Sequence, residues 1–165
     1  IKFSLKNRAK LIYSASSSVL GKNKHLSPYS WTKYANNELI KNFSKWFGLN
    51  YVIVYYYNVY GQNQIKSGFM AAVIGIFEKQ YLSKKPLSIV SPGTQKRDFT
   101  HVEDIVVGTY LAANKSNNQE FHIGCGKNYT LKEVAKMFKH PTIMLDERPG
   151  ERFYSLSNSG KAKKF

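Results

Sequence analysis

The chain has 165 residues, of which 42% are hydrophobic and 15% aromatic, so it has the composition of a folded domain with a core and not of a disordered segment. No stretch approaches the roughly 20 apolar residues needed to cross a bilayer, and the opening residues lack the apolar run of a signal peptide. The single cysteine, Cys125, excludes an intrachain disulfide, and a reducing, cytoplasmic location is the expectation.

The net charge is +15, from 25 Lys and Arg against 10 Asp and Glu. Such an excess is typical of nucleic-acid-binding proteins. However, the lysines are dispersed, and no RNA-recognition, helix-turn-helix or zinc-finger pattern accompanies them. We favour a lysine-rich surface, with part of the charge serving an anionic small substrate. A basic nucleic-acid-binding module stays as the remote alternative.

The first half of the chain alternates strand, helix and strand. Residues 10–15 have the apolar character of a buried strand, which runs into a series of serines. Pro28 and Gly48 bracket a predicted helix over 29–47, because proline suits the first turn and glycine the C-terminal end. Residues 51–57 are β-branched and aromatic without polar alternation, which predicts a central parallel strand covered on both faces.

The second half continues this alternation. Thr130 and Glu133 have the spacing of a capping box and open another predicted helix. The order of strands and helices predicts an α/β domain with parallel strands. Helices are expected over 68–80, 102–113 and 130–138, and short strands over 87–90 and 120–123.

Tyr29 and Lys33 lie four residues apart on the predicted helix, so they share one helix face. A free phenol has a pKa of about 10 and is a poor base at neutral pH, but a neighbouring ammonium favours its ionised form. The pair therefore indicates a proton acceptor, placed just after a strand end that is rich in small hydroxyl residues. The same spacing also occurs in many helices without a catalytic role.

Five segments in chain order resemble signatures of the extended short-chain dehydrogenase/reductases. On these segments the chain is identified as a member of that family, similar to its NAD-dependent nucleotide-sugar epimerases and dehydratases of the UDP-glucose 4-epimerase type. The resemblance covers about residues 10 to 165. The segments are 14–21 with 28–33, then 55–61, 97–105, 123–126 and 148–151.

The resemblance implies roles at the expected catalytic centre. Tyr29 would take the proton from the 4-hydroxyl of the sugar, and Ser16 would hydrogen-bond the reacting oxygen and help to relay that proton. Lys33 would hold the ribose next to the nicotinamide and favour the ionised phenol. NAD is the implied cofactor, with Ser14, Tyr29 and Lys33 as its contacts, and no metal is expected.

The resemblance also implies a set of substrate-binding residues for a nucleotide-diphosphate sugar. Arginine forks pair well with phosphate oxygens, so Arg97 and Arg148 would hold the diphosphate. The alternative for Arg97 is a structural ion pair with Asp98 or Asp104. The implied set is Asn58, Arg97 and Arg148 at the diphosphate and Glu151 near the nucleotide ribose.

The motif at the end of the first strand distinguishes between reactions in the family. Members that dehydrate usually place an acidic pair there, and the decarboxylases tend to carry a glutamate. Here residues 16–18 are serines, and no carboxylate occurs from 10 to 30. We therefore favour a 4-epimerase of the UDP-hexose type over a dehydratase or decarboxylase. Leu20 replaces the family's tyrosine, and the loop over 21–28 is short, so the hexose stays open.

The Gly-rich strand–turn–helix that begins the family fold has no counterpart in this sequence. We therefore expect a partial Rossmann-type parallel sheet with helices on its faces, plus a small C-terminal α/β substrate-binding part. Residues 1–65 would be the second half of the NAD-binding domain, 66–97 and 119–165 the substrate-binding part, and 98–118 a segment returning to the Rossmann domain. The intact enzyme would be a homodimer and this chain inactive alone, with a non-catalytic remnant as the alternative.

Overall fold

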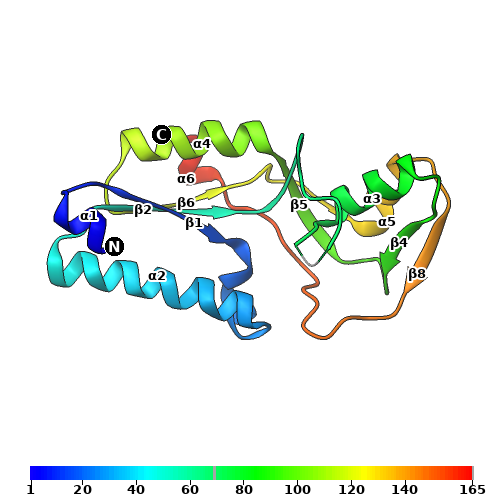
Figure 1. Cartoon of the computed structure of the whole chain (residues 1–165), viewed down its shortest axis with the longest axis horizontal. Helices are drawn as coiled ribbons and strands as arrows, with labels where there is room; N and C mark the ends of the chain where they lie inside the picture. The colour runs from blue at the N-terminus through cyan, green and yellow to red at the C-terminus, as the bar shows by residue number, and fades with distance from the viewer. Residues whose placement is uncertain (69, 165) are drawn as a thin grey trace.

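The structure, a computed structural model, describes residues 1–68 and 70–164, apart from the side chains of Lys22 and Asn23. It has a larger lobe built around one parallel sheet and a smaller lobe beside it (Figure 1). The sheet of the larger lobe contains β1 (Leu11–Ser16), β2 (Tyr51–Tyr56) and β6 (Gln119–Ile123), in the order β1-β2-β6. Both pairings are parallel, which confirms the predicted α/β fold with a partial Rossmann-type sheet.

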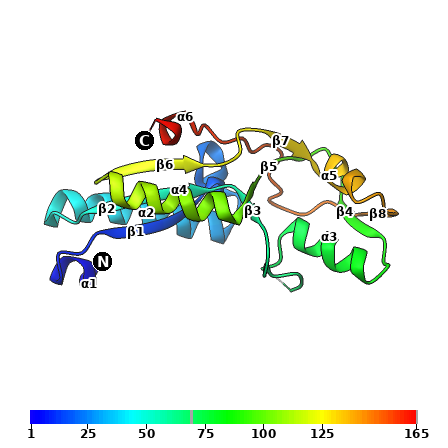
Figure 2. The same ribbon diagram turned by 90° about the horizontal axis from the view of Figure 1, so that it is seen from above.

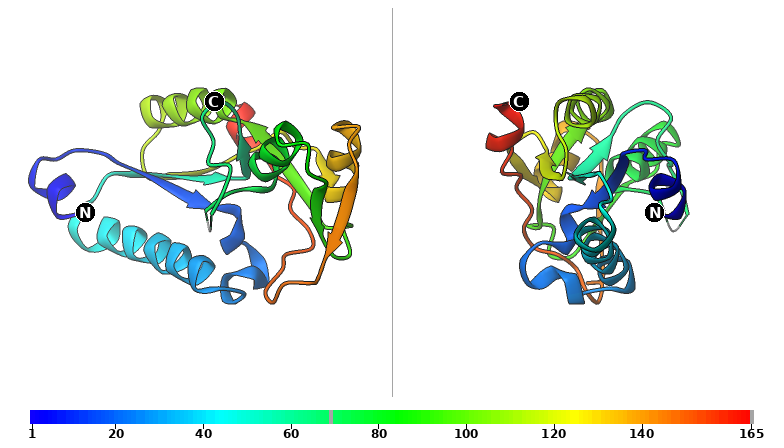
Figure 3. Two further views of the ribbon diagram at one scale, coloured as in Figure 1. Left: turned by 45° about the vertical axis from the view of Figure 1, so that its right-hand side comes forward. Right: turned by 90° about the vertical axis from the view of Figure 1, so that its left-hand side faces the viewer.

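The central strand β2 is covered on both faces, as its unbroken apolar sequence predicts. Val52, Ile53 and Val54 have no solvent-exposed surface. The helix α2 (Pro28–Phe47) lies on one side of the sheet and α4 (Val102–Lys115) on the other (Figure 3). Two apolar clusters fill the layers, one between the sheet and each helix.

The ends of α2 lie where the sequence predicts, at Pro28 and Gly48, and Ser27 adds an N-terminal cap. The Ser27 side chain accepts a hydrogen bond from the backbone N–H of Ser30, and Pro28 occupies the first turn. Gly48 ends the helix in the left-handed conformation, with φ +70°. Two short 3₁₀ turns, η1 (Ser17–Val19) and η2 (Gly21–His25), connect β1 to α2 and bring the first turn of α2 to the end of β1.

The smaller lobe has its own core, formed by α3, β4 and α5. Figure 2 shows these elements gathered beyond the end of the main sheet. A second sheet, in the order β3-β5-β7, connects the two lobes, and β4 pairs in parallel with β8. The elements are β3 (Asn58–Tyr60), α3 (Val73–Leu82), β4 (Leu87–Val90), β5 (Lys96–His101), β7 (Asn128–Thr130), α5 (Leu131–Met137) and β8 (Thr142–Leu145).

The structure differs from the sequence-based expectations at two places. The helix expected over 68–80 begins at Val73, because Gly68 has φ +83° and Ala72 is extended; Phe69 lies outside the described residues. The stretch 119–165 was assigned to the substrate-binding part, but β6 at its start pairs with β2, because this pairing buries Phe121 and Ile123 on the main sheet.

Both ends of the described chain lie on the larger lobe. The N-terminal helix α1 (Lys2–Lys6) precedes β1. After β8 the chain returns from the smaller lobe, and α6 (Gly160–Lys163) packs beside β6 (Figure 1). Within the described residues, no helix has both the length and the apolar character of a membrane span.

Candidate active site

A cleft of about 370 Å³ lies at the carboxyl ends of β1 and β2, where α2 begins. It brings together the four residues that the sequence assigns to the catalytic centre and the cofactor. We call it the strand-end cleft. Its lining residues are Ser14, Ala15, Ser16, Ser17, Tyr29, Lys33, Tyr56, Tyr57, Asn58, Val59 and Arg152.

Lys33 is anchored at the end of β1. Its Nζ donates a hydrogen bond to the backbone oxygen of Ser14 at 2.8 Å, and the same Nζ lies 6.0 Å from the centre of the Tyr29 ring. An ammonium carries three N–H donors, so the bond to Ser14 leaves two of them for a ligand in the cleft. The predicted face-sharing of Tyr29 and Lys33 is therefore present, and the lysine is held in place by the strand.

Ser16, at the end of β1, and Tyr29, in the first turn of α2, both bring hydroxyl groups to this cleft. The Ser16 Oγ accepts a hydrogen bond from the Ser18 backbone N–H at 3.2 Å, which uses a lone pair and leaves the Ser16 O–H free to donate. Tyr29 is 53% exposed. Its phenol is thus accessible to a ligand that enters the cleft.

Arg152 also lines the strand-end cleft, although it was not among the residues selected from the sequence. Its Nη1 donates to the Ser17 Oγ at 3.1 Å. Burial, together with repulsion from the Arg97 guanidinium, lowers the pKa of Arg152 to about 10. One signal in the sequence points to it: only four of the 25 basic residues are arginines, and three of these four are Arg97, Arg148 and Arg152.

A second cleft, of about 190 Å³, lies in the smaller lobe and adjoins the first. The two clefts share Asn58 and Val59, at the point where the chain leaves β2 for β3. We call it the small-lobe cleft. Its lining residues are Asn58, Val59, Tyr60, Ala71, Ala72, Val73, Ile74, Ile76, Ser88, Val90, Arg97, Phe99, Leu131, Arg148 and Glu151.

The four residues that the sequence assigns to the substrate all line the small-lobe cleft. Arg97 is 8% exposed and forms an ion pair with Glu151. Burial lowers the pKa of Arg97, while Glu151 acts in the opposite direction. Glu151 is therefore the acidic partner of Arg97, in place of the Asp98 or Asp104 that the sequence offered as alternatives.

Asp98 does not pair with Arg97; its side chain instead connects three segments of the chain near the junction of the clefts. Its buried carboxylate accepts hydrogen bonds from the backbone N–H groups of Cys125, Gly126 and Ser157. Its backbone oxygen accepts from the Asn58 side chain at 3.0 Å. Asp98 thereby holds β5, the turn after β6 and the C-terminal segment together and orients Asn58.

The turn at 148–151 packs closely against the loop that precedes α2. Gly150 has φ +73°, and a Cβ on it would lie 2.6 Å from the backbone oxygen of Leu26. Only glycine fits both the conformation and this close approach. The contact holds the turn against the loop before α2, so that the residues on either side of Gly150 reach the two clefts.

Tyr57, which lines the strand-end cleft, belongs to a polar network that the sequence did not predict. The Tyr57 hydroxyl lies 2.9 Å from His122 Nδ1, and Tyr55 donates to Glu120 at 2.6 Å. The His122 ring stacks on Tyr55. Burial raises the pKa of Tyr57 to about 12 and lowers the pKa of His122. Both groups are therefore neutral at physiological pH.

In the part of the chain that the structure describes, no group of three or more His, Cys, Asp and Glu side chains is arranged to hold a metal ion. The polar side chains that line the two clefts carry hydroxyls, an ammonium, guanidiniums, an amide and one carboxylate, that of Glu151, which is paired with Arg97. Such groups suit an organic ligand with hydroxyl and anionic groups.

Comparison with known proteins gives consistent results. Residues 2–124 match the profile described as "NAD dependent epimerase/dehydratase family". A putative UDP-glucose 4-epimerase of Methanocaldococcus jannaschii is 37% identical over 115 residues, which are 70% of this chain and 37% of that protein.

Two solved structures have the same fold over nearly the whole chain. The UDP-glucose 4-epimerase of Thermotoga maritima with UDP-glucose matches with a TM-score of 0.92 and 28% identity, covering 99% of this chain and 59% of that one. The UDP-glucuronic acid 4-epimerase of Bacillus cereus with UDP-glucuronic acid and NAD matches with a TM-score of 0.85 and 29% identity, covering 94% and 54%. The chain thus spans less than two thirds of the length of each of these proteins.

Proposed function

This chain belongs to the NAD dependent epimerase/dehydratase family, and from that premise we propose that its protein is a nucleotide-sugar 4-epimerase of the UDP-hexose type. The observation that carries the proposal is the convergence of Ser16, Tyr29 and Lys33 on one cleft, beside a second cleft with arginines. Because the chain spans only part of its relatives, the activity is proposed for the whole protein.

The strand-end cleft fits the nicotinamide end of NAD. It lies at the carboxyl ends of parallel strands, where such folds bind dinucleotides. Lys33 retains two N–H donors for the ribose hydroxyls, and the exposed Ser14 side chain lies beside it. When bound there, NAD would accept and return the electrons of the oxidation at C4.

Tyr29 is the proposed proton acceptor for the 4-hydroxyl of the sugar. Its accessible phenol meets the substrate, and Lys33 is held nearby by Ser14. The Ser16 O–H would donate to the same sugar oxygen and keep it in line with Tyr29. The 4-keto sugar would then rotate and present its opposite face to the cofactor. On reduction, Tyr29 would return the proton to the oxygen at C4.

The small-lobe cleft is the proposed site of the nucleotide diphosphate. Arg148 and Arg97 offer guanidinium donors there, and Asn58 supplies an amide at the junction with the strand-end cleft. Glu151, which holds Arg97, keeps this guanidinium oriented and partly compensates its charge. The sugar would then extend from the small-lobe cleft into the strand-end cleft.

Two other reactions of the family, dehydration and decarboxylation, are the alternatives. Among the described residues that line the strand-end cleft, none is Asp or Glu, so no carboxyl group is available there to protonate a leaving hydroxyl. Epimerisation needs only the reversible oxidation at C4, for which a phenol and a serine suffice. This composition supports the epimerase.

Product mass tests the proposal. The whole protein is incubated with NAD and a UDP-sugar, and the product is examined by mass spectrometry and proton NMR. We expect a product of unchanged mass with inverted configuration at C4. Loss of one water would identify a dehydratase, and loss of carbon dioxide a decarboxylase; either result would refute the proposed reaction.

A cytoplasmic homodimer completes the proposal. Besides Tyr29, which faces the strand-end cleft, the long helix α2 carries four large exposed apolar side chains, which would be covered in a dimer. Light scattering on the whole protein would give twice the monomer mass, and a monomer at micromolar concentration would contradict the proposed dimer. The four side chains are Trp31, Leu39, Trp46 and Phe47.

A further inference from the structure

Arg152 reaches the strand-end cleft from the far end of the chain, and among the described residues its hydrogen-bond partner there is a neutral hydroxyl. Its Nη1 donates to the hydroxyl of Ser17, a residue 135 positions earlier. A guanidinium carries five N–H donors, so one bond to a hydroxyl leaves most of them unused. Among the described residues, no carboxylate lies within ion-pair distance of Arg152.

The surroundings of Arg152 compensate its charge only in part: Glu151 and the hydroxyls of Tyr57 and Tyr29 act to raise its pKa, but burial and Arg97 outweigh them. The guanidinium of Arg97 is near enough to repel it, and the nearby Glu151 is already paired with Arg97. Burial and this repulsion lower the pKa of Arg152 to about 10, which still leaves it protonated at neutral pH. A partly buried cation without an anionic partner is stabilised when a ligand brings the anion.

The geometry of a pyranose indicates where that anion lies on the ligand. In the proposed function, Tyr29 meets the 4-hydroxyl, and Arg152 lines the same cleft as Tyr29. C1, which carries the diphosphate, is across the ring from C4, whereas C3 and C5 are the neighbours of C4. In a hexuronic acid the anionic group is the C6 carboxylate, attached to C5, and it lies beside the reacting carbon.

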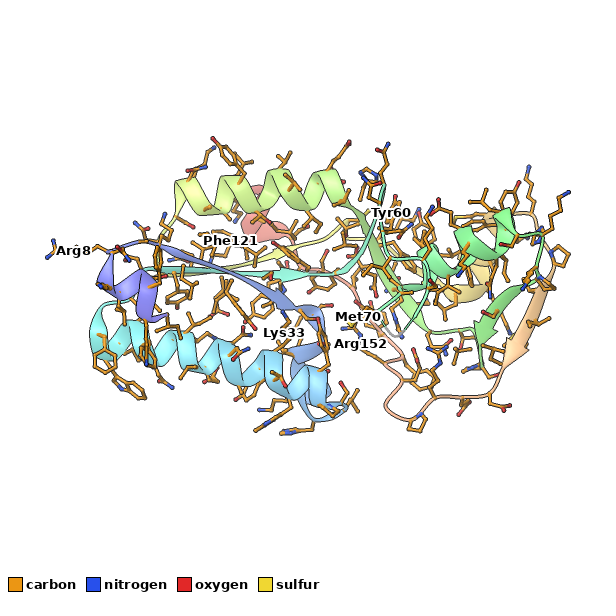
Figure 4. The ribbon with its side chains drawn as sticks, in the orientation of Figure 1. Arg8, Lys33, Tyr60, Met70, Phe121 and Arg152 are labelled. Carbon is orange, nitrogen blue, oxygen red and sulfur yellow. The ribbon has the colours of Figure 1, made fainter. Side chains whose placement is uncertain are left out.

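The diphosphate has other partners in this site. Arg97 and Arg148 line the small-lobe cleft, and the lining of that cleft does not include Arg152. Lys33, the other cation of the strand-end cleft, is held by Ser14 and serves the cofactor in the proposed function. Figure 4 shows Lys33 and Arg152 near the N-terminal end of α2, which faces the smaller lobe, where the C-terminal segment passes. Arg152 is thus the cation of this cleft that has no assigned task.

We propose that Arg152 determines substrate specificity by binding the C6 carboxylate of a nucleotide-linked hexuronic acid. The inference rests on the proposed function, because it takes the 4-hydroxyl to lie at Tyr29. The planar guanidinium matches a carboxylate in two parallel hydrogen bonds. The Ser17 hydroxyl accepts from Arg152 and keeps its own O–H to donate to the same carboxylate.

Ligand binding to the whole protein tests this assignment. Calorimetry compares UDP-glucuronate, UDP-glucose and UDP, and a charged hydrogen-bonded pair predicts a preference for UDP-glucuronate over UDP-glucose of about 10- to 100-fold. Arg152→Gln removes this preference and leaves the affinities for UDP-glucose and UDP unchanged. Arg152→Lys, which keeps the charge but not the fork, retains part of it. Arg8→Gln is the matched control, because Arg8 is exposed and lies far from the clefts (Figure 4).

Several outcomes overturn the assignment. Equal affinity of the wild-type protein for UDP-glucuronate and UDP-glucose does so directly. An equal loss for all three ligands in Arg152→Gln assigns Arg152 to the diphosphate, and a loss of bound NAD assigns it to the cofactor. A lower turnover of both sugars at unchanged affinity means that Arg152 acts on Tyr29. If Arg152→Gln fails to fold, the wild-type preference and its reduction in Arg152→Lys decide the question.

The same samples separate this inference from the proposed reaction. A wild-type preference for UDP-glucuronate that depends on Arg152 supports the inference, whatever the product is. If that product has lost carbon dioxide, the carboxylate site stands and the epimerase proposal fails. If the product is a 4-epimer and the wild-type protein has no preference for the uronate, the epimerase stands and the role of Arg152 fails.

Discussion

The strand-end cleft and the small-lobe cleft each contain a partly buried arginine, and the two arginines are held in different ways. Arg97 in the small-lobe cleft is paired with a carboxylate of the same chain, Glu151. Arg152 in the strand-end cleft donates a hydrogen bond to the Ser17 hydroxyl and forms no ion pair with any described residue. The small-lobe cleft is thus partly neutralised before any ligand binds, whereas the strand-end cleft keeps its positive charge. The difference indicates that the two clefts bind different ends of one ligand, the diphosphate in the small-lobe cleft and the sugar in the strand-end cleft.

Tyr29→Phe provides the strongest test of these separate roles of the two clefts. Loss of a general acid–base group lowers turnover by about 100- to 10,000-fold, whereas the nucleotide contacts in the small-lobe cleft are unaffected. We expect kcat to fall by this factor and the affinity for the UDP-sugar to stay unchanged. Steady-state kinetics and calorimetry give both values. Tyr110→Phe, on the exposed face of α4, is the control. Wild-type turnover in Tyr29→Phe would remove Tyr29 from the mechanism.

Arg148→Ala tests the other end of the ligand. Loss of a charged hydrogen bond to phosphate costs about 1.5–3 kcal/mol, or a factor of roughly 10 to 100 in affinity. We expect this loss for the UDP-sugar and for UDP alike, with little change in kcat at saturating substrate. A sugar phosphate without the nucleotide should lose less. Equal losses for every ligand would indicate a folding defect and contradict the assignment of Arg148.

The Arg97–Glu151 pair predicts an effect on stability that Arg152 does not share. Arg97→Ala leaves Glu151 without its partner in a partly buried position, which costs about 1–3 kcal/mol. Arg152 forms no ion pair with any described residue, so the cost of Arg152→Ala should be clearly smaller. Urea unfolding measures both. If the two variants are equally destabilised, the contrast between a paired and an unpaired arginine is wrong.

The network of Tyr57, His122, Tyr55 and Glu120 beside the strand-end cleft predicts a smaller, pH-dependent effect. Because burial lowers the pKa of His122 in the folded protein, the unfolded chain binds a proton there first as the pH falls. The contribution of His122 to stability is therefore complete above the ordinary histidine pKa of about 6.5 and decreases as the pH falls through and below that value. Thermal unfolding between neutral and acidic pH measures this slope.

His122→Gln should make that pH dependence shallower, because the group that titrates is removed. His25→Gln is the matched control, since His25 is exposed and lies outside the network. The control should keep the wild-type slope. An unchanged slope in His122→Gln would mean that other groups cause the acid sensitivity.

The sequence by itself determined the features that depend on neighbours along the chain. The four-residue spacing of Tyr29 and Lys33 placed them on one helix face, and the cap residues around α2 set its ends within one residue. The unbroken apolar run of β2 indicated a strand covered on both faces, as it is. Such signals are readable because helix and strand periodicity are fixed by backbone geometry within a few residues.

The tertiary structure decided which distant residues meet. Glu151 is 54 residues from Arg97, and Arg152 is 135 residues from Ser17; no periodicity connects such positions. The sequence therefore offered the wrong acidic partners for Arg97 and did not select Arg152. It also assigned β6 away from the main sheet, because a strand's partner depends on which edge is free after the other elements have packed. These contacts follow from the packing of the whole chain, in which each local element has several possible neighbours.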